Sequence, residues 1–127
     1  MEIRVVLDCT DLDAVAAFWC AAAGYERLPD DLDAYASLVP TDPAPARPRL
    51  LLQRVPERKA GKNRLHLDLF PDDGPATVER LTGLGASAIG EPAEEFAERF
   101  GTWFQVMADP EGNEFCVVWR SAPAPWD

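Results

Sequence analysis

The amino-acid sequence predicts an α+β fold built from two βαβββ modules. A strand, a helix and three further strand candidates occur in the same order twice along the chain. In addition, the segment "RVVLD" at 4–8 is echoed by "RLHLD" at 64–68. An internal repeat of this kind indicates two copies of one supersecondary unit that pack together. We therefore predict module 1 at residues 1–58 and module 2 at 59–127, with the boundary inside 56–62.

The first module begins with a strand over residues 3–9, whose alternation predicts two different faces. Thr10 and Asp13 resemble a capping box that starts a helix, and Gly24 ends the helix because glycine accepts a left-handed conformation. The predicted helix carries an apolar stripe at helical spacing, made of Val15, Phe18, Trp19 and Ala22. The core face of the strand is predicted to hold Ile3, Val5, Leu7 and Cys9.

Three strand candidates complete the first module, at 25–28, 34–39 and 49–55. Between the last two lies "PTDPAPARP", which has four prolines. Proline has no backbone N–H and cannot join the interior of a sheet, so this stretch is predicted to be a loop.

The second module repeats the pattern, starting with a strand over 63–70 whose Leu65, Leu67 and Leu69 share one face. Asp73, Gly74 and Pro75 start the helix, since proline is preorganised for a first turn. Its apolar stripe is Val78, Leu81 and Leu84, and Gly85 ends it.

Three strand candidates follow in the second module, at 87–91, 102–108 and 114–119. The last two are joined by "DPEGN" at 109–113, a tight turn in which Pro110 fixes φ and Gly112 supplies a positive φ. Residues 92–101 are predicted to form a short helix or a lid-like loop, anchored by Phe96 and Phe100.

The composition excludes several classes of function. A net charge of -10 and a pI near 4.4 would repel nucleic acid and anionic membranes. The acidity would attract a cationic ligand, although most acidic surfaces serve only solubility. The longest apolar run, 14–25, is shorter than the ~20 residues that a membrane span needs. The N-terminus lacks the pattern of a signal peptide, and three cysteines without CxxC spacing favour a reducing cytoplasm.

The stretch "KNRLHLDLF" at 62–70 holds the single histidine of the chain. Arg64, His66 and Asp68 alternate with leucines, so they lie either on a solvated face or along a ligand-lined cleft. His66 is then either a structural histidine or a functional one. Asp68 would orient or charge the imidazole, or form an ion pair with no further role.

Other candidate residues follow from the repeat and from the last two strands. By the repeat, Arg4 and Asp8 share the face of His66, where the charges satisfy one another or an arginine grips an anionic ligand group. Trp103 is a candidate aromatic wall for a planar ligand, or a core residue with Phe104 and Met107. Cys116 is either an inert core cysteine or a ligand or nucleophile.

Three stretches of the sequence resemble the vicinal oxygen chelate superfamily, the group of glyoxalases, bleomycin-resistance proteins and extradiol dioxygenases. They are "VVLDCTDLDAVAAFWCAAAGYE", "KNRLHLDL" and "VMADPEGNEFCVV". More narrowly, the chain is similar to the small glyoxalase-like domains common in actinobacteria. The resemblance implies paired βαβββ modules in an open half-barrel, a homodimer, and in the metal enzymes one divalent ion that binds vicinal oxygens of the substrate.

The metal-ligand positions of the family fall on Arg4, Gln53, His66 and Cys116. His66 matches, whereas Gln53 offers a neutral oxygen where a carboxylate is usual. Arg4 stays protonated and cannot ligate a cation. Cys116 would suit zinc better than the harder metals of many of these enzymes. The sequence therefore predicts no stoichiometric transition metal and, if a metal binds, the ligands His66, Gln53 and Cys116.

Two functions from different classes remain open. The first is a metal-free protein that binds a small molecule, such as a cationic drug, in its cleft. The second is a lyase, isomerase or oxygenase acting on a small oxygenated metabolite, with His66 as base or ligand and Gln53 and Arg4 positioning the substrate. The candidate ligand-binding residues in either case are Arg4, Asp8, Gln53, Arg64, Asp68, Trp103 and Cys116.

Overall fold

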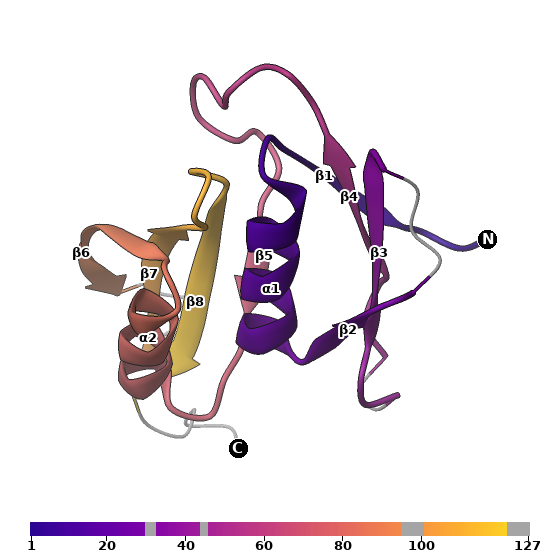
Figure 1. Cartoon of the computed structure of the whole chain (residues 1–127). Coiled ribbons are helices and arrows are strands. Elements are labelled where there is room, and N and C mark those ends of the chain that lie inside the picture. Colours follow the sequence, from indigo (N-terminus) through magenta and orange to yellow (C-terminus); the bar gives the residue numbers. More distant parts are fainter. Residues whose placement is uncertain (30–32, 44–45, 95–100, 122–127) are drawn as a thin grey trace. The chain divides into compact units, whose positions relative to one another are not determined.

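The computed structural model describes residues 1–29, 33–43, 46–94 and 101–121. The chain divides into two compact units, Met1–Ala60 and Gly61–Asp127, and each contains the order strand, helix, three strands (Figure 1). The predicted α+β class and the duplicated βαβββ order are therefore confirmed. The open half-barrel stays a prediction. No helix among the described residues is long and apolar enough to cross a membrane.

The first unit is a four-stranded mixed sheet with one helix packed on it. The strands lie in the order β1-β4-β3-β2, with β1 parallel to β4 and the other neighbours antiparallel. The parallel pair follows from the helical connection that separates β1 from the later strands. The elements are β1 (Val5–Cys9), α1 (Leu12–Ala23), β2 (Tyr25–Arg27), β3 (Tyr35–Pro40) and β4 (Leu50–Arg54).

One face of this sheet packs against α1 and forms the core of the unit. In β1 the burial alternates as predicted, with Cys9 buried and Asp8 exposed. The prediction for Ile3 was wrong, because this side chain lies before the strand and is 75% exposed. The fully buried side chains of the core include Leu12, Val15, Trp19, Leu38 and Leu52.

An aspartate side chain caps the start of helix α1, and a glycine ends the helix. Asp11, and not Thr10, is the N-cap, and its Oδ1 accepts a hydrogen bond from the Ala14 amide at 3.1 Å. Aspartate at this position satisfies an amide of the first turn, which otherwise lacks a partner. The predicted end of the helix is confirmed, since Gly24 adopts a left-handed conformation with φ 69°.

Arg47 ties the loop before β4 to the C-terminus of α1. Its Nη1 donates to the Ala23 carbonyl, and its Nη2 donates to the Gly24 carbonyl at 3.2 Å. The guanidinium also lies 5.1 Å from the centroid of the Tyr25 ring. A positive charge at a helix C-terminus is favourable, because the last carbonyls carry partial negative charge.

Replacing Arg47 by methionine is expected to destabilise the chain by ~1–3 kcal/mol, because two carbonyls lose their donors while most of the apolar stem remains. The buried Nε of Arg47 has no hydrogen-bond partner, and its desolvation offsets part of the stability that the two hydrogen bonds give. Urea unfolding measures the difference. Arg49→Met is the control, since that exposed arginine lies in the same loop. Equal effects of both substitutions would contradict a specific role for Arg47.

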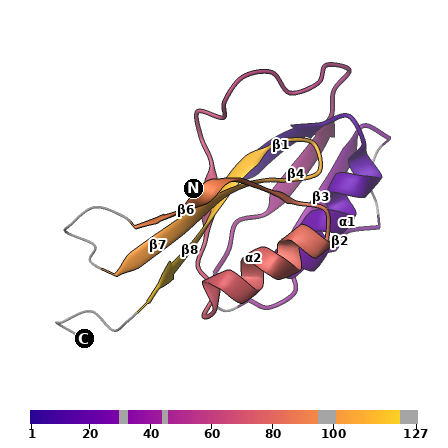
Figure 2. The ribbon, with the colours of Figure 1, turned by 90° about the vertical axis from the view of Figure 1, so that its left-hand side faces the viewer.

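The second unit has the same architecture, with the strand order β5-β8-β7-β6. Strand β5 is parallel to β8, and the remaining neighbours are antiparallel. Figure 2 shows β6, β7 and β8 side by side. The elements are β5 (Leu67–Leu69), α2 (Gly74–Gly83), β6 (Ser87–Glu94), β7 (Thr102–Ala108) and β8 (Glu114–Arg120).

Strand β5 is shorter than the predicted strand at 63–70, and this changes the position of Leu65. The pairing with β8 runs only from Leu67, opposite Phe115, to Leu69. Continuing this parallel register would bring Leu65 opposite Asn113, which lies before β8 begins. Leu65 therefore has no ladder to join and is 75% exposed. The predicted buried face of three leucines was wrong for this residue.

The helix α2 starts as predicted, with Asp73 as N-cap accepting from the Ala76 amide at 2.9 Å. Of its predicted stripe, Leu81 is fully buried but Leu84 is 39% exposed and caps the helix end. Strand β6 extends to Glu94, so the first part of the predicted helix or lid at 92–101 is strand instead. Residues 95–100, with Phe96 and Phe100, lie outside the described residues.

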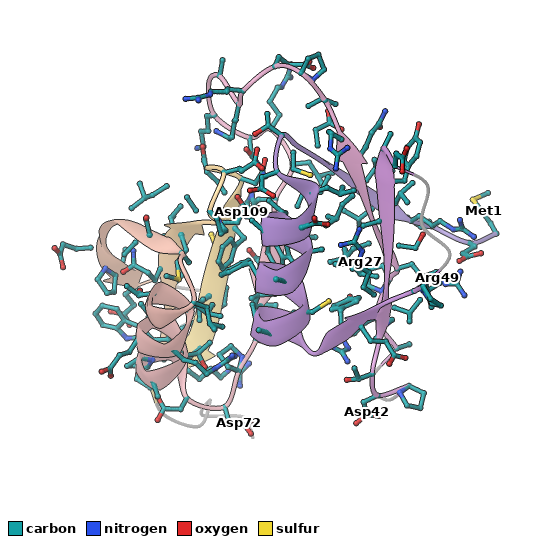
Figure 3. The ribbon with its side chains drawn as sticks, in the orientation of Figure 1. Met1, Arg27, Asp42, Arg49, Asp72 and Asp109 are labelled. Carbon is teal, nitrogen blue, oxygen red and sulfur yellow. The ribbon has the colours of Figure 1, made fainter. Side chains whose placement is uncertain are left out.

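The predicted turn between β7 and β8 is confirmed. Asp109 is buried, and its Oδ1 accepts from the amides of Glu111 and Asn113, both at 2.9 Å. Its Oδ2 accepts from Asn113 Nδ2 at 3.0 Å, and Gly112 has φ 85°. Figure 3 labels Asp109 at this turn. The carboxylate organises the turn by satisfying donors that the short connection leaves without strand partners.

Candidate functional site

The second unit contains a cavity of about 440 Å³ next to the opening stretch of β5. Its apolar wall comes from β7 and β8 and consists of Phe104, Val106, Phe115 and Val118. Its polar side is made largely of residues that precede β5 or lie on it. These polar lining residues are Lys62, Asn63, Arg64, His66 and Asp68, joined by Glu114 and Cys116 from β8.

The strand register explains why these residues meet. In the parallel ladder Asp68 lies opposite Cys116, and in the antiparallel ladder Val106 lies opposite Cys116. Successive side chains alternate between the two faces of a sheet, so residues opposite one another share a face. Strand β8 thus places the Cys116 thiol between the Asp68 carboxylate on one side and the Val106 side chain on the other.

His66 and Asp68 are in direct contact. His66 Nε2 lies 3.1 Å from Asp68 Oδ1, with the two side chains 49% and 43% exposed. The sequence predicts a separation of ~6–7 Å for two residues on one strand face. They come closer because His66 lies just before β5 and is not held in the ladder. The contact fixes the imidazole, and it becomes an ion pair when the ring is protonated.

Cys116 completes a cluster of three potential ligand groups. The ligand atoms of His66, Asp68 and Cys116 all lie within 4.8 Å of one another. Burial raises the pKa of the Cys116 thiol, and the nearby Asp68 carboxylate raises this pKa further, while Lys62 acts in the opposite direction. The thiol is therefore protonated at neutral pH in the absence of a bound cation.

At pH 7, Cys116 is expected to react slowly with iodoacetamide, and its rate should increase with pH and reach half of its maximum only above the ordinary thiol pKa of 9.0. Asp68→Asn should make the reaction severalfold faster at a given pH, because it removes the negative charge that disfavours the thiolate. Peptide mapping by mass spectrometry follows each cysteine separately. An unchanged Cys116 rate in Asp68→Asn would contradict the electrostatic coupling of the two groups.

The cluster fits a divalent ion of intermediate softness. Zinc binds imidazole nitrogen, carboxylate oxygen and thiolate sulfur at ~2.0–2.3 Å, so its ligand atoms lie somewhat less than 4 Å apart. The observed limit of 4.8 Å requires only small side-chain rotations to reach that spacing. Three protein ligands would leave a fourth position for a small molecule, the arrangement typical of catalytic zinc.

Of the two other predicted site residues of this unit, Arg64 lines the cavity and Trp103 does not. Arg64 lines the cavity together with His66, Asp68 and Cys116. Trp103 does not line it, whereas its neighbour Phe104 does. Trp103 pairs with Trp119 on the opposite face of the sheet.

Three polar lining residues were absent from the prediction, namely Lys62, Asn63 and Glu114, and so were the apolar lining residues Val106, Phe115 and Val118. A sequence signal existed for Lys62 and Asn63, since both belong to the stretch that precedes the histidine. Asn63 Nδ2 donates to the Glu114 carbonyl at 3.4 Å, which holds the start of this stretch against β8. Glu114 carried no comparable signal, because its position depends on pairing between distant segments.

The remaining candidates belong to the first unit. Arg4 is exposed, with its Nε 3.4 Å from Glu2 Oε1. Asp8 and Gln53 lie opposite each other in the parallel pair of β1 and β4. They therefore share the sheet face that does not pack on α1, which is the face that the repeat predicts for Asp8. A role for these three residues in ligand binding stays a prediction.

Several solved structures share this fold at low sequence identity. A glyoxalase/bleomycin resistance protein/dioxygenase family enzyme from Burkholderia phytofirmans PsJN is 17% identical and has a TM-score of 0.75, over 92% of this chain and 96% of that chain. The fosfomycin resistance protein FosX from Listeria monocytogenes is 13% identical and has a TM-score of 0.73, over 97% and 91%. Such identities show the fold alone.

The family assignment comes from the sequence profile. A superfamily member from Sphaerobacter thermophilus DSM 20745 has the same fold, at 19% identity and a TM-score of 0.66 over 94% of this chain and 98% of that chain. No curated protein matches the chain. The profile described as a glyoxalase-like domain matches residues 4–118. The chain therefore belongs to the glyoxalase-like domain family.

Proposed function

We propose that this protein binds a small molecule in the cavity of its second unit. The observation that carries the proposal is the division of the cavity into an apolar wall and a polar side that contains the His66–Asp68 pair. Small-molecule sites are typically apolar concavities of ~300–1,000 Å³ with a few polar groups that set orientation. The cavity of about 440 Å³ falls within this range.

The charge of the cavity narrows the class of ligand. The chain as a whole has a net charge of -10, but the cavity lining does not share this excess of acid. Lys62 and Arg64 on its edge oppose Asp68 and Glu114. This balance favours a ligand with a polar or anionic group beside its apolar part over a purely cationic drug, since a cation gains little attraction from a neutral lining.

A thermal-shift screen followed by calorimetry tests the proposal. The library should contain small carboxylates and phosphonates with an apolar part, oxygenated metabolites and glycopeptide drugs. A ligand at 100 times its Kd stabilises the folded state by ~2.7 kcal/mol, so even a weak cognate compound is detectable. Phe104→Ala should weaken binding of any hit, and Asp72→Asn, an exposed residue outside the lining, should not. Equal affinities of both variants would contradict binding in this cavity.

A second candidate is a metal-dependent lyase, isomerase or oxygenase acting on a small oxygenated metabolite. The observation that favours it is the cluster of His66, Asp68 and Cys116. A bound ion would act there as a Lewis acid, and the protein residues would hold and orient the substrate. The harder metals of many superfamily enzymes are not favoured, because a thiol stands where a carboxylate is usual. Turnover that requires an added metal and is lost with a chelator would support this candidate.

The proposal also includes a homodimer in a reducing cytoplasm. Strand β6 lies at the edge of its sheet, and all eight of its residues are exposed. Such an edge presents backbone donors and acceptors that a second copy can pair with. The three cysteines are all described and form no disulfide. Light scattering measures the mass of the protein in solution. A mass of one chain at tens of micromolar, roughly above the dissociation constants of ordinary dimers, would contradict the dimer.

A further inference from the structure

We propose that the ligand of the cavity is an amphiphilic carboxylate with a straight apolar chain. Its charged end binds to Lys62 and Arg64, and its chain continues past the cavity to Ile89 and Ala93 on β6. The inference rests on the proposed binding function and names the class of ligand. It also assigns the selection of chain length to two residues that do not line the cavity.

The charged end of the ligand is determined by two cationic side chains. Lys62 and Arg64 are exposed and line the cavity. Neither forms an ion pair with another residue in the described part of the chain, whereas Asp68 already contacts His66. The charge of Lys62 reaches the interior of the cavity, since it acts to lower the pKa of the Cys116 thiol. A guanidinium and an ammonium without partners favour one carboxylate at this end.

The cavity face of the sheet changes from polar to apolar along β8. Glu114, Cys116 and Val118 follow one another on this face. Asn63 Nδ2 donates to the Glu114 carbonyl at 3.4 Å, so the cationic stretch is held at the polar end of the strand. At the apolar end, Val118 lies opposite Phe104 of β7. A ligand whose anionic group binds at the polar end therefore directs its apolar part toward β7.

The apolar wall continues from β7 onto the edge strand β6, which lies beside it in Figure 2. Ile89 lies opposite Val106, and Ala93 lies opposite Phe104. Residues opposite one another share a face, so both β6 side chains extend the cavity face. Ile89 is 45% exposed and open to a ligand. From Cys116 to Ile89 the distance is two strand spacings, or ~10 Å, which an extended chain of about eight carbons covers.

A β-bulge keeps this extension apolar. Residues 90–92 of β6 correspond to a single residue of β7, Gln105. A regular antiparallel ladder would place Glu91 opposite Phe104, whereas the bulge places Ala93 there. Gln105 is buried and fixes the bulge, because its Nε2 donates to two carbonyls of β6 at 3.2 Å each. The bulge thus replaces a carboxylate on the wall by a methyl group, which favours an apolar chain over a polar one.

Isothermal titration calorimetry of the full-length chain with straight-chain carboxylates, from butyrate to decanoate, tests the inference. Affinity should rise about 2-fold to 4-fold with each added methylene, the upper value being that of full burial. It should level off beyond octanoate, where the chain passes Ile89. Octanamide and octylamine carry the same chain with a neutral and a cationic end. Both should bind about 10-fold more weakly than octanoate, because neither accepts charge-assisted hydrogen bonds from two cations.

Two pairs of variants assign the two ends of the ligand. Ile89→Ala should weaken binding of octanoate about 3-fold but not that of butyrate. Its control is Leu84→Ala, since this leucine is 39% exposed and belongs to α2, which packs on the other face of the sheet. Arg64→Gln should weaken octanoate about 5-fold and leave octanamide unchanged. Arg58→Gln removes the same charge from an exposed residue outside the lining and should have no effect. Urea unfolding checks that each variant is folded.

Each outcome decides for or against this class of ligand. Equal affinities for octanoate, octanamide and octylamine would refute the charged end. Affinity independent of chain length, or an equal effect of Ile89→Ala on butyrate and octanoate, would refute the apolar extension. Failure of every carboxylate in the series, while another compound binds and is weakened by Phe104→Ala, would overturn this inference and leave the proposed function intact. Absence of binding by any compound would overturn both.

Discussion

Replacing Gly74 by alanine is expected to destabilise the protein by several kcal/mol. A Cβ at this first position of α2 would lie 2.1 Å from Trp119 Cδ2 and 2.3 Å from Trp119 Cγ. Overpacking typically costs ~1–3 kcal/mol and occasionally more. The upper part of that range applies here, because Cγ is attached directly to the Cβ of Trp119, so the ring can move away only by a change of rotamer or a shift of the strand.

Gly83→Ala is the matched control for this substitution. Gly83 is the last residue of the same helix, and nothing lies within 4 Å of a Cβ added there. Alanine should therefore be neutral or stabilise the helix by up to ~1 kcal/mol. Both changes replace glycine by alanine, although Pro75 restricts an alanine at position 74 more than any neighbour restricts one at 83. Urea unfolding of the two variants gives the combined cost of the contact with Trp119 and of this restriction.

A double-mutant cycle then assigns the effect to the tryptophan. Trp119→Ala in the Gly74→Ala background should recover much of the stability that Gly74→Ala loses, since it removes the clashing ring. Fully additive losses would contradict the close approach of α2 to Trp119. The same contact identifies the face of β8 that lines the cavity, because the face that carries Trp119 packs against α2. Cys116 and Val118 must then lie on the other face.

The elements that local chemistry specifies could be predicted from the sequence. Strand β7 has the predicted bounds, and the 109–113 turn forms as expected, since proline, glycine and a buried carboxylate act within a few residues of one another. Gly24 ends α1 and Asp73 begins α2 for the same reason. In each case the deciding hydrogen bonds join atoms that are close along the chain.

The errors concern contacts between segments that are distant in the sequence. Leu65 is exposed because the register of β5 against β8 leaves it opposite a residue that precedes β8, and no local pattern records that register. Alternation along β7 puts Trp103 and Phe104 on opposite faces of the sheet but does not indicate which of them faces α2. Trp119 contacts Gly74 of α2, and Trp103 lies opposite Trp119 in the ladder, so Trp103 is on the helix side. The proximity of Cys116 to Asp68 likewise depends on the β5–β8 register.

His66→Ala is expected to weaken binding of a cavity ligand by at least ~10-fold while leaving the fold intact. The imidazole and the Asp68 carboxylate form the polar contact of the cavity, and losing one hydrogen bond to a charged group costs ~1.5–3 kcal/mol, which corresponds to roughly 10-fold to 150-fold in affinity. Calorimetry with the strongest compound from the screen, or with zinc as a probe, measures the loss.

The fold should survive because His66 lies outside the β5 ladder and its side chain is 49% exposed. Substitutions at such positions usually change the free energy of unfolding by less than ~0.5 kcal/mol. Urea unfolding therefore separates the two readings of this histidine. A purely structural His66 would lower stability and leave affinity unchanged, whereas a ligand-binding His66 would lower affinity and leave stability unchanged. His66→Gln sharpens the test, since its amide can still pair with Asp68 but is a far poorer metal ligand than imidazole. Affinity for an organic ligand should then recover in part, while zinc binding should not.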